Sequence, residues 1–315
     1  MFACEPGPVV GGYGDRIVGL IAVRVMAKLL NREFQILWTR DDLSSYFEYS
    51  AFDHEKLKPY DAWFRNLRMI DQPRRIAEHL RTSPSPLAEP GDFKRTDLLG
   101  VSISVNTETA QYLFQNPRIV NRGQARAEYL RVMKWAYQTL HTEVLKPTPR
   151  VLKRMQEVVG DRTGLVGIQI RAGDAFMKTG TAWDKRTQYL EGEAGVKRTL
   201  ENIRARLDPT VMVFVTGDHP QTVKLAREVF GEAHVLGDDE PAQHLDRRQA
   251  EKLDQTKLYS DALILAQRCS ELHISSNSNF GRVAALAGGV ETVYGLDGQP
   301  LSTLELFSKT RTVFD

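Results

Sequence analysis

Four short loops in the second half of the chain carry the residue types that could bind an anionic ligand. They read Arg171-Ala172-Gly173-Asp174, Thr216-Gly217-Asp218-His219-Pro220, Gly237-Asp238-Asp239 and Ser275-Ser276-Asn277-Ser278-Asn279-Phe280-Gly281-Arg282. An arginine presents a planar fork of donors that suits a diphosphate. Hydroxyls and backbone N–H groups ahead of a helix form a ready phosphate site. Together the loops predict a diphosphate site that needs no metal ion.

Each loop also has an ordinary structural interpretation. Arg-x-Gly-Asp is a common turn, and a Ser/Asn cluster before a helix is most often an N-cap. Thr216 to Pro220 can simply start a capped helix with proline at its first position. The occurrence of all these loops after successive predicted strands favours the binding interpretation.

The elements that must position these loops alternate strictly between strand and helix. Apolar runs predict strands over 165–170, 211–215, 233–236, 271–274 and 291–294, and helical patterns cover 195–207, 220–230, 255–268 and 278–286. Such alternation with short connections indicates a parallel, doubly wound α/β sheet. Ligands bind at the carboxyl ends of the strands in such sheets. We therefore expect the loops to face a common cleft.

The first half of the chain has a weaker pattern. A strand over 8–10, glycines at 11, 12 and 14, a helix over 16–30 capped by Asp15 and a strand over 34–38 predict a first βαβ unit. Gly12 and Gly14 fit the start of a dinucleotide fingerprint, but Ile17 occupies the place of its third small residue. We interpret the glycines as a tight turn that lets a ligand approach the backbone. Residues 39–117 read as loops and short helices with a strand over 98–105, and 124–141 as an amphipathic helix.

Bulk properties limit the class of protein. The 315 residues suit two domains, and the formal net charge of +2 argues against a nucleic-acid partner. No apolar run is long enough for an integral membrane segment, and the start, MFACEPGPVV, lacks the pattern of a secretory signal. Two distant cysteines, Cys4 and Cys269, fit a reducing compartment, so we expect a cytoplasmic location.

The order of the motifs resembles the fucosyltransferase superfamily, which includes bacterial nodulation and core α-1,6-fucosyltransferases and protein O-fucosyltransferases. The resemblance rests on Gly-x-Gly-Asp-Arg before the first helix, Arg-x-Gly-Asp and Thr-Gly-Asp-x-Pro after strands, Asp261 on a helix, and Ser-x-Ser-x-Phe-Gly-Arg-Val-Ala. It covers roughly residues 10–30 and 147–290.

The resemblance implies an α/β, GT-B-type fold with two Rossmann-like domains facing a cleft. We expect an N-terminal, acceptor-side domain over 1–160, a nucleotide-sugar-binding domain over 161–300, and a segment over 301–315 that packs back on the first domain. It also implies a GDP-fucose donor, a glycan or other hydroxyl acceptor, inversion at the anomeric carbon, no cofactor and no metal.

The resemblance also implies roles for individual residues. Arg171 would bind the β-phosphate and stabilise the leaving GDP, and Asp261 would accept hydrogen bonds from guanine. Asp218 falls where the family has an acidic residue near the donor. The remaining implied donor-binding residues are Gln169, Ser276, Ser278, Asn279, Phe280 and Arg282, with Gly12, Gly14 and Asp15 on the acceptor-domain side.

Two departures from the family pattern concern the chemistry. Gln169 stands where the family usually has a histidine that contacts guanine or ribose. The glutamate that α-1,6 enzymes carry after the arginine motif is missing, which leaves Asp174 and Asp184 as candidate bases. An inverting transfer needs a base, or a transition state dissociative enough to proceed without one. Asp174 has the alternative role of orienting Arg171.

Several alternatives remain open on the sequence. Another nucleotide-sugar, such as GDP-mannose or a UDP-sugar, would suit the same loops. An inactive nucleotide- or glycan-binding relative would explain both departures, whereas the broken fingerprint weakens a dinucleotide-dependent oxidoreductase. The acidic pairs Asp41-Asp42 and Asp238-Asp239 permit a metal-dependent enzyme, although the chain lacks a His-Glu-x-x-His motif and a cysteine cluster.

Overall fold

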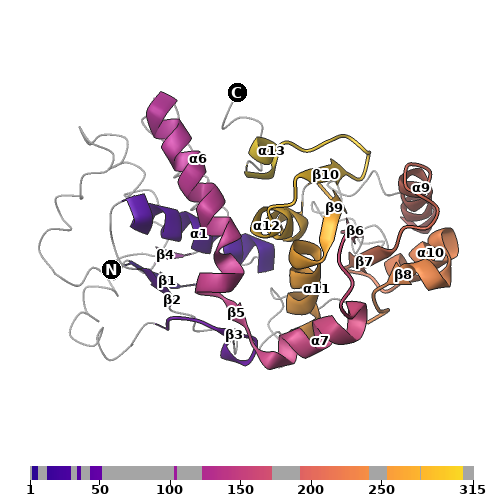
Figure 1. Ribbon diagram of the computed structural model, residues 1–315, viewed down its shortest axis with the longest axis horizontal. Helices are drawn as coiled ribbons and strands as arrows, with labels where there is room; N and C mark the ends of the chain where they lie inside the picture. The colour runs from indigo at the N-terminus through magenta and orange to yellow at the C-terminus, as the bar shows by residue number, and fades with distance from the viewer. Residues whose placement is uncertain are drawn as a thin grey trace, which may run out of the picture. The chain divides into compact units, whose positions relative to one another are not determined.

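The computed structural model divides the chain into two compact units, Met1–Lys146 with Thr310–Asp315, and Pro147–Lys309. It describes residues 2–5, 13–29, 34–36, 43–51, 103–104, 123–171, 192–240, 254–276 and 278–307. The described parts of both units are mixtures of helices and parallel strands (Figure 1).

The first unit contains a small parallel sheet and two long helices. Its strands β1 (Phe2–Glu5), β2 (Phe34–Ile36) and β4 (Ile103–Ser104) lie in the order β2-β1-β4. The helices are α1 (Tyr13–Leu29) and α6 (Gly123–Gln138), which pack against each other. The remaining elements are η1 (Leu43–Ser45), β3 (Phe47–Glu48) and the π-helical turn η4 (Leu140–Val144). The two-residue strand β5 (Lys146–Pro147), which pairs with β3, spans the boundary between the units.

Helix α1 forms because its apolar residues recur with helical spacing. Ile17, Leu20 and Ile21 are fully buried, and positions three and four apart lie on one face of a helix. Asp15 in the first turn and Lys28 in the last turn complement the helix dipole.

The structure describes a strand near the N-terminus that the sequence analysis did not predict. The predicted strand over 8–10 lies outside the described residues, and the observed first strand is Phe2–Glu5. It pairs in parallel with β2 and β4 through Cys4, which is in register with Ile36 and Ile103. Four residues with one charged member give too little periodicity to recognise a strand without its neighbours.

The second unit is built on a five-stranded parallel sheet with the order β10-β9-β6-β7-β8. Its strands are β6 (Leu165–Ile170), β7 (Val213–Gly217), β8 (Val235–Leu236), β9 (Cys269–Ile274) and β10 (Thr292–Gly295). The chain starts in the middle at β6, moves outward to β8, and then crosses to β9 on the other side of β6. This reversal between β6 and β9 is where doubly wound sheets bind ligands.

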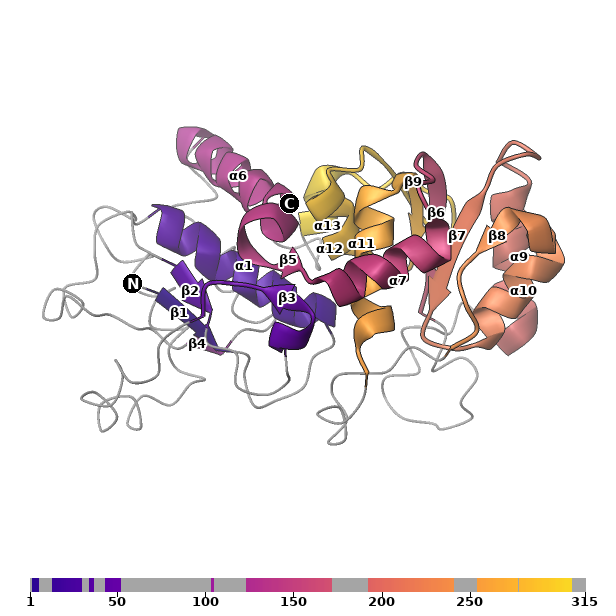
Figure 2. The same cartoon turned by 60° about the horizontal axis from the view of Figure 1, so that its bottom comes forward.

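Helices cover both faces of this sheet. They are α7 (Pro149–Val159), α9 (Gly192–Arg204), α10 (Gln221–Phe230), α11 (Thr256–Gln267) and α12 (Asn279–Gly288), with η7 (Glu232–His234) before β8 and α13 (Thr303–Phe307) after β10. In Figures 1 and 2, α9 and α10 lie on one side of the strands, and α7, α11 and α12 lie on the other.

The two faces of the sheet differ in composition. Ile168 and Ile170 of β6 and Val215 of β7 belong to an apolar core with residues of α9 and α10. The opposite face carries Gln169 and Thr216, which are in register with each other and are buried. The face toward α11 therefore ends, at the carboxyl edge of the sheet, in buried polar side chains.

A glycine allows α11 to pack closely on this face. A methyl group at Gly167 would lie 2.5 Å from Cδ2 of Leu272 and 2.8 Å from Cδ2 of Leu265. Since real contacts of this kind are longer, only glycine fits at this point of β6 without movement of its neighbours.

Candidate functional site

The loops after β6 and β9 are joined at the reversal point of the sheet. The backbone N–H of Arg171 donates to Oγ of Ser275 at 2.9 Å, and the N–H of Ser275 donates to the carbonyl oxygen of Gln169 at 3.0 Å. Ser275 is fully buried. The arginine predicted to bind phosphate thus lies beside the serine-rich loop that starts α12.

Helix α12 begins directly after this loop, so its first backbone N–H groups lie beside the loop. Its N-cap residue, Ser278, has an extended backbone (φ −93°, ψ 116°) and makes no side-chain capping bond. The backbone N–H of Ser278 donates to the carbonyl oxygen of Ser275 at 2.8 Å, which closes a turn before the helix. The first N–H groups of a helix lack partners within the helix and attract anions. Ser278 and Asn279 therefore lie where the sequence motif predicted phosphate contacts.

Gln169 brings a buried acceptor oxygen next to this loop. Its side chain is 5% exposed, and within the described part of the chain its Oε1 has no hydrogen-bond partner. A methyl group at Gly281 of α12 would lie 2.8 Å from that oxygen, so the glycine provides room for the glutamine. A buried carbonyl without a partner costs about 1–3 kcal/mol. A ligand donor at this point would remove that cost.

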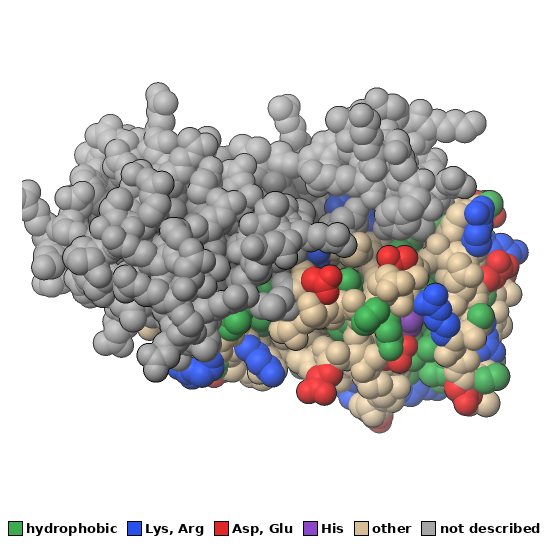
Figure 3. Space-filling view, turned by 90° about the horizontal axis from the view of Figure 1, so that it is seen from above, with side chains coloured by type: hydrophobic (Ala, Val, Ile, Leu, Met, Phe, Trp, Pro, Cys, Tyr) green, Lys and Arg blue, Asp and Glu red, His purple; other side chains and the backbone are tan. Residues whose placement is uncertain are grey.

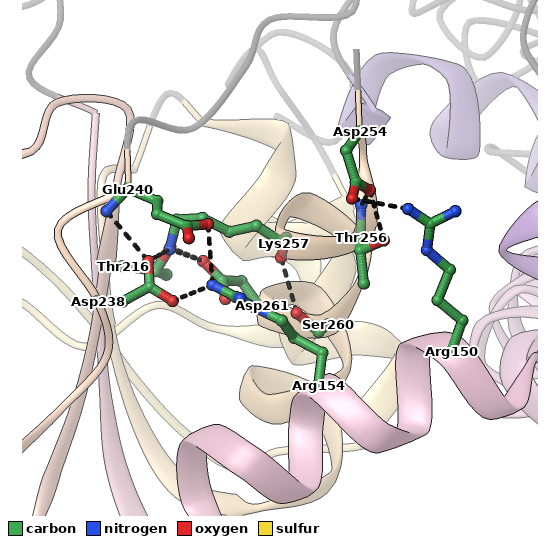
Figure 4. Close-up of polar contacts among 10 residues, drawn as sticks. All are labelled: Arg150, Arg154, Thr216, Asp238, Glu240, Asp254, Thr256, Lys257, Ser260 and Asp261. Atoms are coloured by element: carbon green, nitrogen blue, oxygen red, sulfur yellow. Dashed lines mark hydrogen bonds and ion pairs between the residues drawn. The ribbon is translucent and has the colours of Figure 1, made fainter.

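Asp261 lies inside the polar face of the sheet, and its carboxylate is held by neighbours. Oδ2 accepts hydrogen bonds from Oγ1 of Thr216 at 2.6 Å and from Nζ of Lys257 at 3.0 Å (Figure 4). The residue is 2% exposed. Burial raises the pKa of Asp261, and the interactions with Lys257 and Thr216 oppose that shift. Lys257 and Thr216 thus favour the ionised form of this carboxylate.

Lys257 extends the network to the loop after β8. Its Nζ lies 2.9 Å from Oδ1 of Asp238, while Oδ2 of Asp238 is paired with Arg154 of α7 (Figure 4). Burial alone would lower the pKa of Lys257, but the two carboxylates outweigh it and raise that pKa. Arg154 also contacts Glu240 at 3.1 Å. Buried charges are retained when they are paired in this way.

The acidic pair Asp238-Asp239 is used for ion pairs with the chain's own cations. Asp239 pairs with Nη1 of Arg227 at 2.6 Å, and Asp238 pairs with Lys257 and Arg154. Within the described ranges, no three His, Cys, Asp or Glu side chains are grouped as a metal site. Asp41-Asp42 lies outside the described residues.

The other predicted site residues fall into three groups. Asp218, Ser276, Phe280 and Arg282 lie at the carboxyl ends of β7 and β9 and in the first turn of α12. Gly14 and Asp15 lie in the first turn of α1, in the first unit. Asp174, Asp184 and Gly12 lie outside the described residues.

Sequence reasoning placed Ser275 and Thr216 in the candidate loops without giving either a role of its own, and it missed Lys257. Ser275 and Thr216 each stand at the end of an apolar strand, and their hydroxyls link neighbouring elements. Lys257 precedes Asp261 by four residues on α11. That spacing brings opposite charges together on a helix and is the one signal that could have identified the lysine.

The described surface carries a mixed distribution of charge. On the face drawn in Figure 3, Lys and Arg side chains are interspersed with Asp and Glu side chains wherever the residues are described. Among the helices that the structure describes, none has both the length and the apolar character to cross a membrane.

Comparison with known proteins finds solved structures of similar fold. No protein-family model matches the chain, and no curated protein matches its sequence. A mutant of Arabidopsis thaliana FUT1 in complex with GDP aligns with 93% of this chain and 69% of that chain, at 15% identity and a TM-score of 0.55. NodZ alpha-1,6-fucosyltransferase soaked with GDP-fucose aligns with 91% of this chain and 92% of that chain, at 14% identity and a TM-score of 0.51.

These similarities agree with the resemblance found in the motifs. The parallel five-stranded sheet with helices on both faces confirms the α/β class, and the two structures extend the agreement over nearly the whole chain. The chain therefore has the GT-B-type α/β fold of the fucosyltransferases.

Proposed function

We propose that this protein is an inverting, metal-independent glycosyltransferase that moves fucose from GDP-fucose to a hydroxyl of a glycan or another acceptor. The observation that carries the proposal is the joining of Arg171 to Ser275 at the reversal point of the sheet, beside the N-terminus of α12. The fold supports it, because the two aligned structures contain GDP or were soaked with GDP-fucose.

Arg171 is the residue to which we assign stabilisation of the leaving GDP. Negative charge accumulates on the diphosphate as the sugar bond breaks, and a guanidinium offers two parallel donors to it. Ser276, Ser278, Asn279 and Phe280 would surround the diphosphate with hydroxyls and helix N–H groups. Arg282, in the first turn of α12, would add a second positive charge.

Guanine recognition is assigned to the polar face of the sheet. The N1–H and N2–H₂ edge of guanine carries donors, and Gln169 and Asp261 both bring acceptor oxygens to this face. Asp218, at the end of β7, is assigned to the donor site as well. Gly12, Gly14 and Asp15 would line the acceptor-domain side.

The base for the acceptor hydroxyl is assigned to Asp174 or Asp184, and Asp174 has the alternative role of orienting Arg171. Metal independence is supported by the ion pairs of Asp238 and Asp239, which commit these carboxylates to Lys257, Arg154 and Arg227. The low cysteine content supports a cytoplasmic location.

A nucleotide panel tests this proposal. Thermal unfolding is measured with excess GDP, UDP or NAD, each with and without EDTA. A ligand that binds only the folded state at a hundredfold its Kd stabilises it by about 2.7 kcal/mol. We expect GDP alone to raise Tm, with no effect of EDTA, and fucose transfer in a subsequent assay with GDP-fucose.

The other outcomes identify the competing functions. Stabilisation by UDP, or by GDP only without EDTA, indicates another nucleotide-sugar or a metal-dependent mechanism. Stabilisation by GDP without transfer to any of a panel of hydroxyl acceptors indicates a binding protein that lost the chemistry. Stabilisation by NAD contradicts the glycosyltransferase proposal altogether.

A further inference from the structure

Lys257 lies between two carboxylates and contacts both. Its Nζ is 2.9 Å from Oδ1 of Asp238 and 3.0 Å from Oδ2 of Asp261, and its side chain is 9% exposed (Figure 4). One ammonium therefore serves two acidic groups, of which Asp261 is almost completely buried.

This ammonium joins elements that are distant in the sequence. Asp238 belongs to the loop after β8, whereas Asp261 belongs to α11 and accepts a hydrogen bond from Thr216 at the end of β7. Arg154 of α7 holds the other oxygen of Asp238. The Asp261 carboxylate thus contacts the end of β7 directly, and through Lys257 and Asp238 it is linked to the loop after β8 and to α7.

We propose that Lys257 is a positioning residue for nucleotide binding, which holds the Asp261 carboxylate in place, and that Asp238 competes with Asp261 for the same ammonium. This inference rests on the proposed function, since it takes Asp261 as an acceptor for the donors of the base. Neither Lys257 nor Asp238 has to touch the nucleotide for this role.

The electrostatic effects of the two neighbours on Asp261 have opposite signs. Burial raises the pKa of Asp261, Lys257 lowers it, and Asp238 raises it. Arg154 of α7 reaches Asp238, and α12 contributes Arg282 as its charged residue. Glu271 and His273 of β9 are in register with Val166 and Ile168 of the apolar core, on the opposite face of the sheet.

The two neighbours therefore predict opposite changes in the pH dependence of GDP binding. A guanine donor binds the ionised carboxylate, so affinity falls as pH decreases through the pKa of Asp261. Lys257→Met removes the cation, raises that pKa and moves the loss of affinity to higher pH. Asp238→Asn removes the competing charge, lowers that pKa and moves the loss of affinity to lower pH.

The experiment measures Kd for GDP from pH 5 to 9 by calorimetry for wild type, Lys257→Met and Asp238→Asn. Lys197→Met is the matched control, because Lys197 forms an exposed ion pair with Glu228 from α9 to α10. We expect Lys257→Met to bind GDP more weakly than wild type below the pH at which its affinity begins to fall, by up to about tenfold for each pKa unit by which that fall is displaced. Lys197→Met should follow the wild-type curve, and the ionisation of GDP itself is common to all four proteins.

Opposite displacements of the two curves support the proposal. Displacements in the same direction, or curves that coincide with wild type, overturn it while leaving GDP binding intact. If Lys257→Met does not fold, the Asp238→Asn curve decides, since only the proposed competition moves it to lower pH. Absence of GDP binding by wild type overturns the proposed function and this inference together.

Discussion

Each unit of the protein buries a cation, and the two cations have different surroundings. Arg24 of α1 is 5% exposed; its Nη1 donates to the carbonyl oxygen of Ala136 at 2.8 Å, and its Nη2 pairs with Oε2 of Glu143 at 2.6 Å. Its guanidinium also stacks 4.1 Å from the ring centre of Trp135. Lys257 in the second unit instead contacts two carboxylates.

We interpret the difference as a packing role for Arg24 and, under the proposed function, a role near the nucleotide for Lys257. The partners of Arg24 are one carboxylate, a backbone carbonyl and an aromatic ring, so the charges balance and the contacts fasten α1 to the α6 region. Lys257 is shared by Asp238, which follows β8, and by Asp261 of α11, which accepts a hydrogen bond from Thr216 in β7. The carboxyl ends of parallel strands are where ligands bind. Changes at Arg24 and its contacts should therefore act on stability, and changes at the strand ends of the second unit should act on nucleotide binding.

The largest expected effect comes from Arg171 at the end of β6. Arg171→Ala should lower the rate of fucose transfer by about 10²–10³-fold, the usual loss when one donor to a developing negative charge is removed. Arg171→Lys should also be impaired, because a point charge does not replace the planar fork. Steady-state kinetics measure the loss, and an unchanged Tm shows that the fold is retained. Unchanged turnover, or loss of folding, contradicts the role assigned to Arg171.

His141 predicts a pH dependence of stability that belongs to the first unit. Burial lowers the pKa of His141 to about 4 from its ordinary 6.5, so the folded state favours the neutral ring. The resulting stability is present above pH 6.5 and is lost as pH falls from there toward 4, up to about 3 kcal/mol. Urea unfolding at pH 7 and 5 measures it, and His141→Gln should reduce the difference between the two. If the free energy of unfolding differs as much between pH 7 and 5 in His141→Gln as in wild type, other groups cause the acid sensitivity.

Arg24→Met should have a smaller effect, confined to stability. The methionine keeps an apolar chain but leaves the carbonyl of Ala136 without its donor, which costs about 1–3 kcal/mol. Lys28→Met is the matched control, since Lys28 is exposed and only lies 5.2 Å from the ring centre of Trp135. Urea unfolding gives the destabilisation, and GDP affinity should stay within about twofold of wild type, well under 1.4 kcal/mol. A marked loss of GDP affinity in Arg24→Met would break the division of roles.

The regular part of the second unit was predictable because its strands are continuous apolar runs. The strand expected over 165–170 coincides with β6, and those expected over 211–215 and 271–274 overlap β7 and β9. Buried parallel strands need apolar residues on both faces, which makes them visible in a sequence. In the first unit, the short β1 gave no such pattern. The predicted helix over 124–141 ends at Gln138 instead and continues as the π-helical turn η4.

For the site, the sequence by itself determined the residue types at the strand ends, namely an arginine after β6, Ser and Asn residues before α12, and an acid on α11. The sequence also predicted that these residues lie at one edge of the sheet, because strands that alternate with helices run parallel and end at the same edge. Only the tertiary structure decided that Asp238 is a partner of Lys257 and that the Oε1 of Gln169 is buried within the described residues without one. The reason is that such contacts depend on sheet register and helix packing, which join residues far apart in the chain.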